Sequence, residues 1–378
     1  MHRLRRLGRG QLIAAAAAVV VIIGLGTWFV VGLGQTPPVA ASPSASASPT
    51  AEPSRSPSPS PSPSLAPAVA CPLNGLPVAD PSLLGRVALS VTIDNHPGAR
   101  PARNLSNADL VVEVPVEGDT TRFSAIFLCR PTVGLTGPIR SARYYVIDLW
   151  QDLHVLTIGF GASPPTLQRL ADAGTPYVNG ISGGWPWFRR AGAYRAPHNV
   201  YGDLEALRSA LGSGGAIDRA AAVVGPIRAP IPFDVHAVLP RGRTVSGVEI
   251  RTNSFWRFGW SWHEATGRWA RQDAGVAVTD EVTGDPLRVS HVLVQLVTQE
   301  VVYGDPDPGG NPRRLQHLVG QGDGVLYSGG RAIPVRWSRP TVNDGTHWTY
   351  TEDGEPVVLQ PGVIWWEIVP ISASVTES

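Results

Sequence analysis

The sequence contains no lysine. All 31 basic residues are arginine, and with 30 acidic residues the 378-residue chain has a net charge of +1. Without a lysine amine the protein cannot form a Schiff base, which excludes enzymes that depend on one. A charge so close to zero produces no strong field for a polyanion, so we expect no nucleic acid as a partner.

Cysteine is nearly absent as well. Cys71 and Cys129 are the two cysteines, with 57 residues between them. In an exported protein they can form one disulfide that ties the start of the folded part to a strand, but the spacing leaves open whether they pair. The chain has no pair of CxxC units, no HExxH and no glycine-rich phosphate-binding motif, and its nine histidines are scattered. We therefore expect neither a metal nor a cofactor.

The N-terminal residues indicate where the protein works. A basic, cytoplasmic segment at 1–10 precedes a predicted transmembrane signal-anchor at 11–34, whose uncharged apolar run covers 12–33. At about 1.5 Å per helical residue this run reaches roughly 33 Å, enough to cross a membrane once. The bulk of the chain is then extracytoplasmic. Two alternatives stay open, namely cleavage near residues 38–41 and lipidation of Cys71.

A tract rich in Pro, Ser and Ala follows the anchor, at residues 35–70. It has almost no apolar side chains to bury and cannot offset the entropy of ordering, so we expect a disordered linker. Proline keeps such a tract extended, at about 3.1 Å per residue, as a spacer that could carry glycans. The rest is long enough for two domains, predicted at 71–232 and 233–378.

The domain at 71–232 is predicted to be α+β, a layered arrangement of several strands and helices. Apolar and polar residues alternate in three stretches, which predicts strands with one buried face. These stretches are 87–93, 110–117 and 122–129. The period of two places Glu113 and Glu117 on the same face of their strand.

Helices are predicted after these strands. The first spans 142–153, where apolar residues recur at helical spacing, and Ser141 is its expected N-cap. The second opens at Ser163, before two prolines, and ends at Gly174. The third spans 203–211.

The domain at 233–378 is predicted to be β-rich. Turn signals recur between alternating stretches, and the longest strand is predicted at 291–302. Eight of the twelve tryptophans lie after residue 250. An aromatic-rich sheet can be a carbohydrate platform, but tryptophans more commonly form the core, and the core is the interpretation that we favour.

Several stretches are shared with a known family. They are VTIDNHP and ARP within 91–101, AD, EG and TRF within 108–123, GPIRSAR at 137–143, HNVY at 198–201, and the region 345–370 with its PG and WW. Over most of residues 73–370 the chain resembles the YerB-like lipoproteins, an envelope family of unknown function with an N-terminal and a C-terminal domain. The resemblance implies a mixed α+β fold and an envelope location, and no established reaction. The chain departs from the family in its membrane span, which stands in place of a lipidated cysteine, and in Asp119, where glycine is expected.

Polar residues at strand ends and in loops form the candidate ligand-binding site. They are Asp94, Asn95, Glu117, Arg122, Arg140, Ser141, Arg143, His198 and Asn199. Arginine binds carboxylate or phosphate through two hydrogen bonds, and the predicted helix N-terminus after residue 141 also favours an anion. In the competing interpretation the arginines pair with nearby carboxylates and only fix loops.

We expect a binding module that recognises an anionic ligand, such as a cell-wall polymer, or an envelope protein. The alternative is a carboxylate-based hydrolase of a cell-wall polymer, with Asp94, Glu117 and His198 as candidate catalytic residues. The backbones of Glu113 and Glu117 are roughly 13 Å apart on an extended strand, beyond the roughly 5–9.5 Å of paired glycosidase carboxylates, so Asp94 with Glu117 is the better pair. A third interpretation is a structural scaffold, whose polar residues pair with one another and leave no open cleft.

Overall fold

The computed structural model describes residues 69–182, 185–214, 216–240, 242–252 and 256–378. The basic segment, the signal-anchor and the linker as far as residue 68 lie outside this part, so what the sequence predicts for them stays a prediction. Among the described residues, none of the helices has the length and apolar character needed to cross a membrane. The described residues from 69 to 378 form one compact unit.

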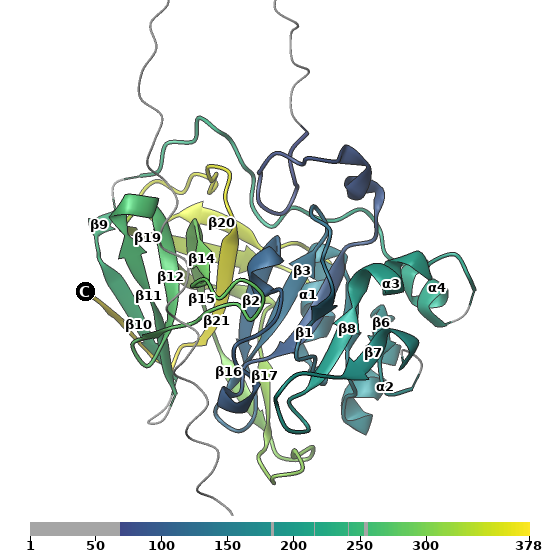
Figure 1. Ribbon diagram of the computed structural model, residues 1–378. Coiled ribbons are helices and arrows are strands. Elements are labelled where there is room, and N and C mark those ends of the chain that lie inside the picture. Colours follow the sequence, from purple (N-terminus) through teal and green to yellow (C-terminus); the bar gives the residue numbers. More distant parts are fainter. Residues whose placement is uncertain (1–68, 183–184, 215, 241, 253–255) are drawn as a thin grey trace, which may run out of the picture. The chain divides into compact units, whose positions relative to one another are not determined.

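A large mixed sheet runs through both predicted domains (Figure 1). Across the sheet, its strands are β20 (His347–Tyr350), β19 (Arg331–Arg339), β18 (Gly320–Ser328), β15 (His291–Val297), β21 (Ile364–Pro370), β2 (Leu110–Pro115), β3 (Thr121–Phe127), β1 (Leu89–Asp94), β5 (Leu156–Gly159) and β6 (Tyr177–Asn179), and β9 (Arg243–Thr244) pairs with β19. β21 is parallel to both of its neighbours, β15 and β2. The two predicted domains therefore share a sheet, and their boundary at residue 233 stays a prediction.

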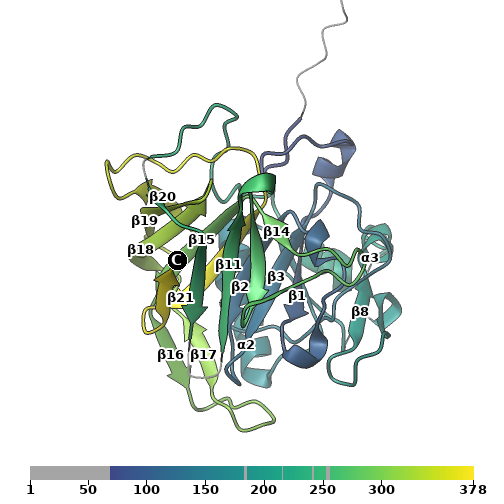
Figure 2. The same ribbon diagram turned by 60° about the vertical axis from the view of Figure 1, so that its left-hand side comes forward.

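A second, antiparallel sheet lies against one face of the large sheet (Figure 2). Its strands are β13 (Val276–Ala277), β12 (Arg268–Asp273), β11 (Arg257–His263), β10 (Gly247–Arg251) and β22 (Ser374–Glu377), and β14 (Arg288–Val289) pairs with β12. Two small sheets complete the described strands, namely β16 (Gln299–Val302) with β17 (Arg313–Gln316), and β4 (Leu135–Thr136) with β8 (Val200–Asp203) and β7 (Phe188–Arg190). The prediction of one long strand over 291–302 is wrong, because β16 leaves the large sheet to pair with β17.

The helices are short. The described α-helices are α1 (Tyr145–Leu153), α2 (Pro164–Asp172), α3 (Leu204–Ser209) and α4 (Ala216–Ala221), and the 3₁₀ turns are η1 (Pro81–Gly85), η2 (Pro97–Ala99), η3 (Leu105–Asn107), η4 (Trp185–Trp187) and η5 (Glu264–Thr266). Ser163 caps α2 by accepting the N–H of Thr166 at 3.3 Å, as predicted. The predicted start of α1 at residue 142 is wrong. The helix begins at Tyr145 without a side-chain cap.

Both faces of the large sheet are buried at β1, β2 and β3. On one face, Leu89 and Val91 of β1 belong to a core that includes Trp260 and Trp269 of the second sheet. On the other face, Val112 of β2 lies in a core with residues of α1. The prediction of half-buried strands is therefore wrong. The fold class is confirmed, with a mixed α/β N-terminal domain followed by an antiparallel β-rich C-terminal domain, and the buried tryptophans belong to the core.

Candidate functional site

The candidate site lies at the carboxyl end of β1, where residues 137–142 cross the ends of β1 and β5. The backbone N–H of Asp94 donates to the carbonyl of Pro138 at 2.8 Å, and Arg140 donates back to β1 at 2.8 Å. The N–H of Phe160 donates to the carbonyl of Arg140 at 2.9 Å. These bonds fix the backbone of Arg140 beside the last residue of β1.

Asp94, His96, Arg140 and His198 form a group that we call the histidine cluster. Oδ2 of Asp94 lies 2.7 Å from Nδ1 of His198 and 3.2 Å from Nε of Arg140. Its Oδ1 accepts the backbone N–H of His96 at 3.1 Å. The Asp94 side chain is 4% exposed, whereas those of His198 and Arg140 are 20% and 25% exposed. A buried carboxylate thus holds an imidazole and a guanidinium that both reach the surface.

The ring of His96 stacks on that of His198. Their centroids are 4.4 Å apart and the rings are inclined by 14°. Nδ1 of His96 accepts the N–H of Gly98 at 3.0 Å, so the neutral ring carries its proton on Nε2. Burial lowers the pKa of His96, and the neighbouring His198 acts in the same direction, while Asp94 opposes them. Burial and the hydrogen bond from Gly98 therefore favour the neutral form of His96.

Glu117, Arg122, Arg143 and Arg313 form a second group, the arginine cluster. Nε of Arg143 donates to both oxygens of Glu117, at 2.9 and 2.8 Å, and Nη1 of Arg313 donates to Oε1 at 2.5 Å. Arg122 Nη2 lies 3.6 Å from the same oxygen. Asp305 balances part of this charge, with Oδ2 at 3.5 Å from Nε of Arg313. All four side chains of the arginine cluster are buried.

The arginines determine how Glu117 ionises. Burial disfavours its charged form, but the hydrogen bond from Arg143 and the charges of the three arginines outweigh burial and lower the pKa of Glu117 to about 2. Burial, with the charge of Arg143, lowers the pKa of Arg122 to about 9. Glu117 is thus a permanent counter-ion at neutral pH and cannot act there as a proton donor.

The third group, the intersheet cluster, consists of Glu113, Arg271 and Glu367. Nη2 of Arg271 lies 2.8 Å from Oε1 of Glu113, and its Nε lies 3.9 Å from Oε1 of Glu367. Asn95 belongs here and not beside Asp94, because its Nδ2 donates to Oε1 of Glu113 at 3.2 Å. The expectation that Glu113 and Glu117 share a face is wrong. Glu113 faces the second sheet, whereas Glu117 lies in the turn after β2 and joins the arginine cluster.

The remaining predicted residues have local partners. Oγ of Ser141 donates to the carbonyl of Phe160 at 3.0 Å and caps no helix, which removes the predicted anion site at a helix N-terminus. The carbonyl of Ser141 instead accepts guanidinium donors from Arg122 and Arg143. Oδ1 of Asn199 accepts from Nη1 of Arg190 at 2.6 Å, so it lies outside the histidine cluster.

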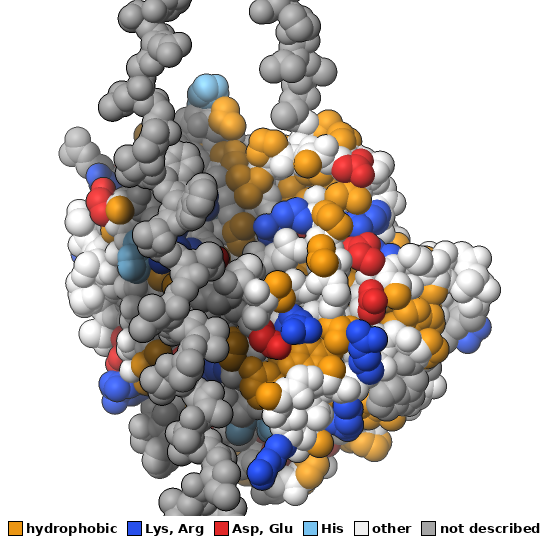
Figure 3. All heavy atoms as spheres, in the orientation of Figure 1, with side chains coloured by type: hydrophobic (Ala, Val, Ile, Leu, Met, Phe, Trp, Pro, Cys, Tyr) orange, Lys and Arg blue, Asp and Glu red, His pale blue; other side chains and the backbone are white. Residues whose placement is uncertain are grey.

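The described surface shows no separation of charge on the face drawn in Figure 3, where arginine side chains are scattered among acidic and apolar ones. A cavity of about 680 Å³ opens elsewhere, between residues 228–232 and 343–349, with Trp348 and Val357 in its wall. None of the predicted site residues lines this cavity.

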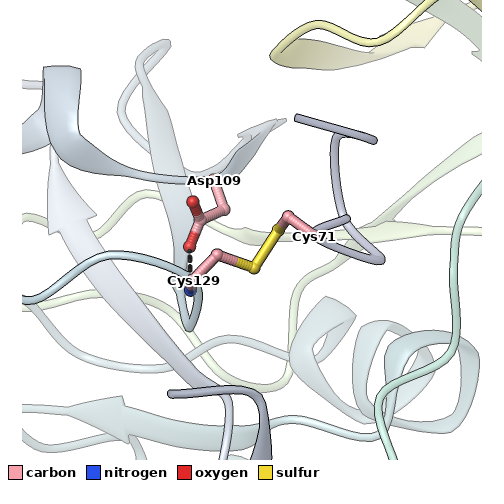
Figure 4. A group of neighbouring side chains, drawn as sticks. All are labelled: Cys71, Asp109 and Cys129. Atoms are coloured by element: carbon pink, nitrogen blue, oxygen red, sulfur yellow. Dashed lines mark hydrogen bonds between the residues drawn. A yellow bond between two sulfur atoms is a disulfide. The ribbon is translucent and has the colours of Figure 1, made fainter. Parts of the chain in front are cut away.

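Cys71 and Cys129 form a disulfide with their Cα atoms 5.8 Å apart (Figure 4). Oδ2 of Asp109 accepts the backbone N–H groups of Leu128 and Cys129, both at 2.8 Å. The two cysteines and Asp109 have the proximity of metal ligands, within 4.8 Å, but a sulfur in a disulfide has no thiolate to offer. The group therefore fixes the chain around Cys129 and does not fit a metal.

Two family models match the chain. "Protein of unknown function (DUF3048) N-terminal domain" matches residues 73–217, and "Protein of unknown function (DUF3048) C-terminal domain" matches residues 248–366. The chain belongs to the DUF3048 family. This DUF3048 chain is 28% identical over 301 residues to "Putative lipoprotein YerB" of Bacillus subtilis (strain 168). The matched region covers 79% of this chain and 86% of that protein. The crystal structure of YerB protein from Bacillus subtilis has a TM-score of 0.67 at 26% identity and covers 82% of this chain and 99% of that chain. The resemblance seen in the motifs is confirmed.

Sequence reasoning missed three contributors to the polar clusters of this DUF3048 protein. Arg313 and Asp305 come from the distant C-terminal domain, and no local pattern marks them as partners of Glu117. His96 lies two residues after Asp94, and an extended strand would place both side chains on the same face. The chain leaves β1 before His96, however, and the 3₁₀ turn η2 returns the ring to His198.

Proposed function

We propose that this chain is a membrane-anchored extracytoplasmic protein that binds an anionic ligand of the cell envelope through the histidine cluster. The observation that carries the proposal is the buried carboxylate of Asp94, which orients both Arg140 and His198 while their outer atoms reach the surface. A guanidinium held in one orientation loses little entropy when it binds a carboxylate or phosphate.

The location rests on three observations. The apolar run at 12–33 follows four arginines, as in a signal-anchor that leaves the C-terminal part outside. The Cys71–Cys129 disulfide suits an oxidising compartment. The similar Bacillus subtilis protein is described as a lipoprotein. A lipid on Cys71 would need the sulfur that the disulfide uses, so we favour the signal-anchor over lipidation.

The carboxylate-based hydrolase is the weaker candidate. Glu117 is ionised down to about pH 2 and bonded to two arginines, so it can serve neither as a general acid nor as an unhindered nucleophile. Asp94 is shared between two other partners, Arg140 and His198. The buried residues of the arginine cluster pair with one another, as the scaffold interpretation predicts. That interpretation applies to the arginine cluster and not to the histidine cluster.

The test is co-sedimentation of the full-length protein, in detergent, with purified bacterial cell-wall sacculi. We expect the wild type to sediment and Arg140→Ala to lower the affinity about tenfold or more, since a hydrogen bond to a charged group contributes about 1.5–3 kcal/mol. Arg336→Ala is the matched control, because that side chain is 59% exposed and far in sequence from the cluster.

A wild type that stays in the supernatant contradicts the proposal and favours a protein partner. Sedimentation that is equal for wild type and Arg140→Ala, when both have the same melting temperature, contradicts the assignment of the site.

A further inference from the structure

His198 has the environment of a general base. Its Nδ1 is 2.7 Å from Oδ2 of Asp94, which keeps the proton on Nδ1 and leaves the lone pair of Nε2 available. No residue of the described part of the chain makes a hydrogen bond to that Nε2. The ring is one-fifth exposed, so water can reach it.

Two further groups complete the surroundings of this base. Arg140 shares Oδ2 of Asp94 through its Nε, and among the described residues its terminal nitrogens have no hydrogen-bond partner. His96 is stacked on His198 and carries its proton on Nε2. Arg100 lies near His96 and helps to disfavour a second positive charge there. A proton acceptor, a cation and an N–H donor therefore lie together.

We propose that the histidine cluster hydrolyses a carboxylic ester of an envelope polymer, with His198 as the general base and Asp94 as the residue that positions it. This activity rests on the proposed function, because the polymer that binds at the histidine cluster must also carry the ester. The anion that the site binds would then occupy the place where the oxyanion of the transition state develops.

The reaction consumes one water and needs no other reactant. Nε2 of His198 takes a proton from water while the water oxygen bonds to the carbonyl carbon, and the carbonyl electron pair moves to its oxygen, beside Arg140. When the carbonyl forms again, the bond between carbon and the alcohol oxygen breaks. The protonated His198 gives its proton to that oxygen, and the products are a carboxylic acid and an alcohol.

The available groups favour an ester over a glycosidic bond. One histidine can act as base and then as acid in acyl transfer, whereas a glycosidase needs two carboxyl groups, one of them protonated. Water is the nucleophile because Oγ of Ser141 donates to a carbonyl and both cysteines are in the disulfide.

The experiment measures p-nitrophenol release from p-nitrophenyl acetate, and acetate release from O-acetylated sacculi, by the full-length protein. We expect His198→Ala to lower kcat/KM about 100-fold or more, and added imidazole to restore part of the rate. His236→Ala is the matched control, an exposed histidine outside the cluster, and keeps the wild-type rate. Asp94→Asn lowers kcat with little change in KM, a division that a merely structural role would not produce.

The measurements on sacculi and on p-nitrophenyl acetate separate ester hydrolysis from binding. Sacculi that are bound without acetate release, with no p-nitrophenol release above buffer, overturn the ester hydrolysis and leave the binding proposal intact. A His198→Ala variant that keeps both its melting temperature and its rate also overturns it. If Asp94→Asn does not fold, His198→Ala with imidazole rescue carries the test alone, and an absence of rescue counts against the proposal.

Discussion

Arg313 donates a hydrogen bond of 2.5 Å to Glu117, a residue 196 positions earlier in the chain. The bond joins the hairpin of β16 and β17 to the turn after β2, and so links the two DUF3048 domains through a buried charge. Arg122 and Arg143 approach the same carboxylate from the N-terminal domain. One carboxylate therefore neutralises arginines that would otherwise repel one another in a buried place.

Removal of this carboxylate destabilises the protein. We expect Glu117→Gln to lower the free energy of unfolding at neutral pH by about 3–5 kcal/mol, because three buried arginines lose their counter-ion. Asp119→Asn is the control and changes stability by less than about 0.5 kcal/mol, because that side chain is half exposed and its ion pair with Arg314 is 3.8 Å long. Urea denaturation of both variants measures the difference, and equal losses would contradict the assignment.

The same carboxylate makes the protein sensitive to acid. The pKa of Glu117 is about 2 in the folded state against an ordinary 4.5, so the unfolded state binds the proton first as the pH falls. The contribution of Glu117, on the order of 3 kcal/mol, is present above about pH 4.5 and is lost as the pH falls towards 2. Denaturation of wild type and Glu117→Gln across this range should give curves that converge in acid. Parallel curves would refute the linkage.

Glu367 has the opposite pH dependence. Burial, and then the charge of Glu113, raise its pKa well above 4.5, although Arg271 opposes them. The folded state therefore binds more protons than the unfolded state above pH 4.5, and stability falls as the pH rises towards the raised pKa. In the wild type, Nε1 of Trp260 donates to Oε1 of Glu367 at 2.9 Å, and Glu367→Gln keeps an oxygen that can accept this bond. Because glutamine does not ionise, the variant loses this dependence of stability on pH. We expect the free energy of unfolding of the variant to exceed that of the wild type at about pH 9, and the two values to be closer at about pH 5. Urea denaturation at the two pH values measures the difference.

The disulfide between Cys71 and Cys129 closes a loop with a sequence separation of 58. In the chain-entropy view, a loop of this length contributes about 4 kcal/mol by restricting the unfolded state. We expect the Cys71→Ser/Cys129→Ser double variant to lose roughly that amount in urea denaturation. A reductant should lower wild-type stability and leave the double variant unchanged. Mass spectrometry of the native protein that finds a lipid on Cys71 would contradict the pairing.

The tryptophans distinguish a core from a carbohydrate platform. Trp269 is 0% exposed and packs against Trp262 and Tyr327, with ring centroids 5.3 and 5.8 Å away. We expect Trp269→Ala to cost about 3–5 kcal/mol, and Trp262→Ala, at a half-buried position, to cost less. Intrinsic fluorescence titrated with cell-wall oligosaccharides should not change its emission maximum. A saturable shift would support the platform that we reject.

Local signals in the sequence were sufficient for some elements. Ser163 before two prolines predicts the start of α2, and Asp203, which accepts the N–H of Ala206 at 3.0 Å, caps α3.

Other features depend on backbone geometry or on distant residues. Gly118 and Asp119 have positive φ angles of 71° and 54°, and this tight turn takes Glu117 out of the strand plane that a period of two assumes. Ser141 has the residue type of an N-cap, but its hydroxyl bonds the loop after β5, so the helix begins later. The partnership of Glu117 with Arg313 has no signal in a single sequence, because only the closed fold brings the two together.

The parallel insertion of β21 between β15 and β2 determines when the sheet can close. The chain emerges N-terminus first during synthesis and export, so β2 and β15 each keep unpaired backbone groups along one edge until residues 364–370 arrive. A product that ends before residue 364 keeps two open strand edges, which are templates for pairing with other chains. We therefore expect premature termination to yield an aggregation-prone polypeptide.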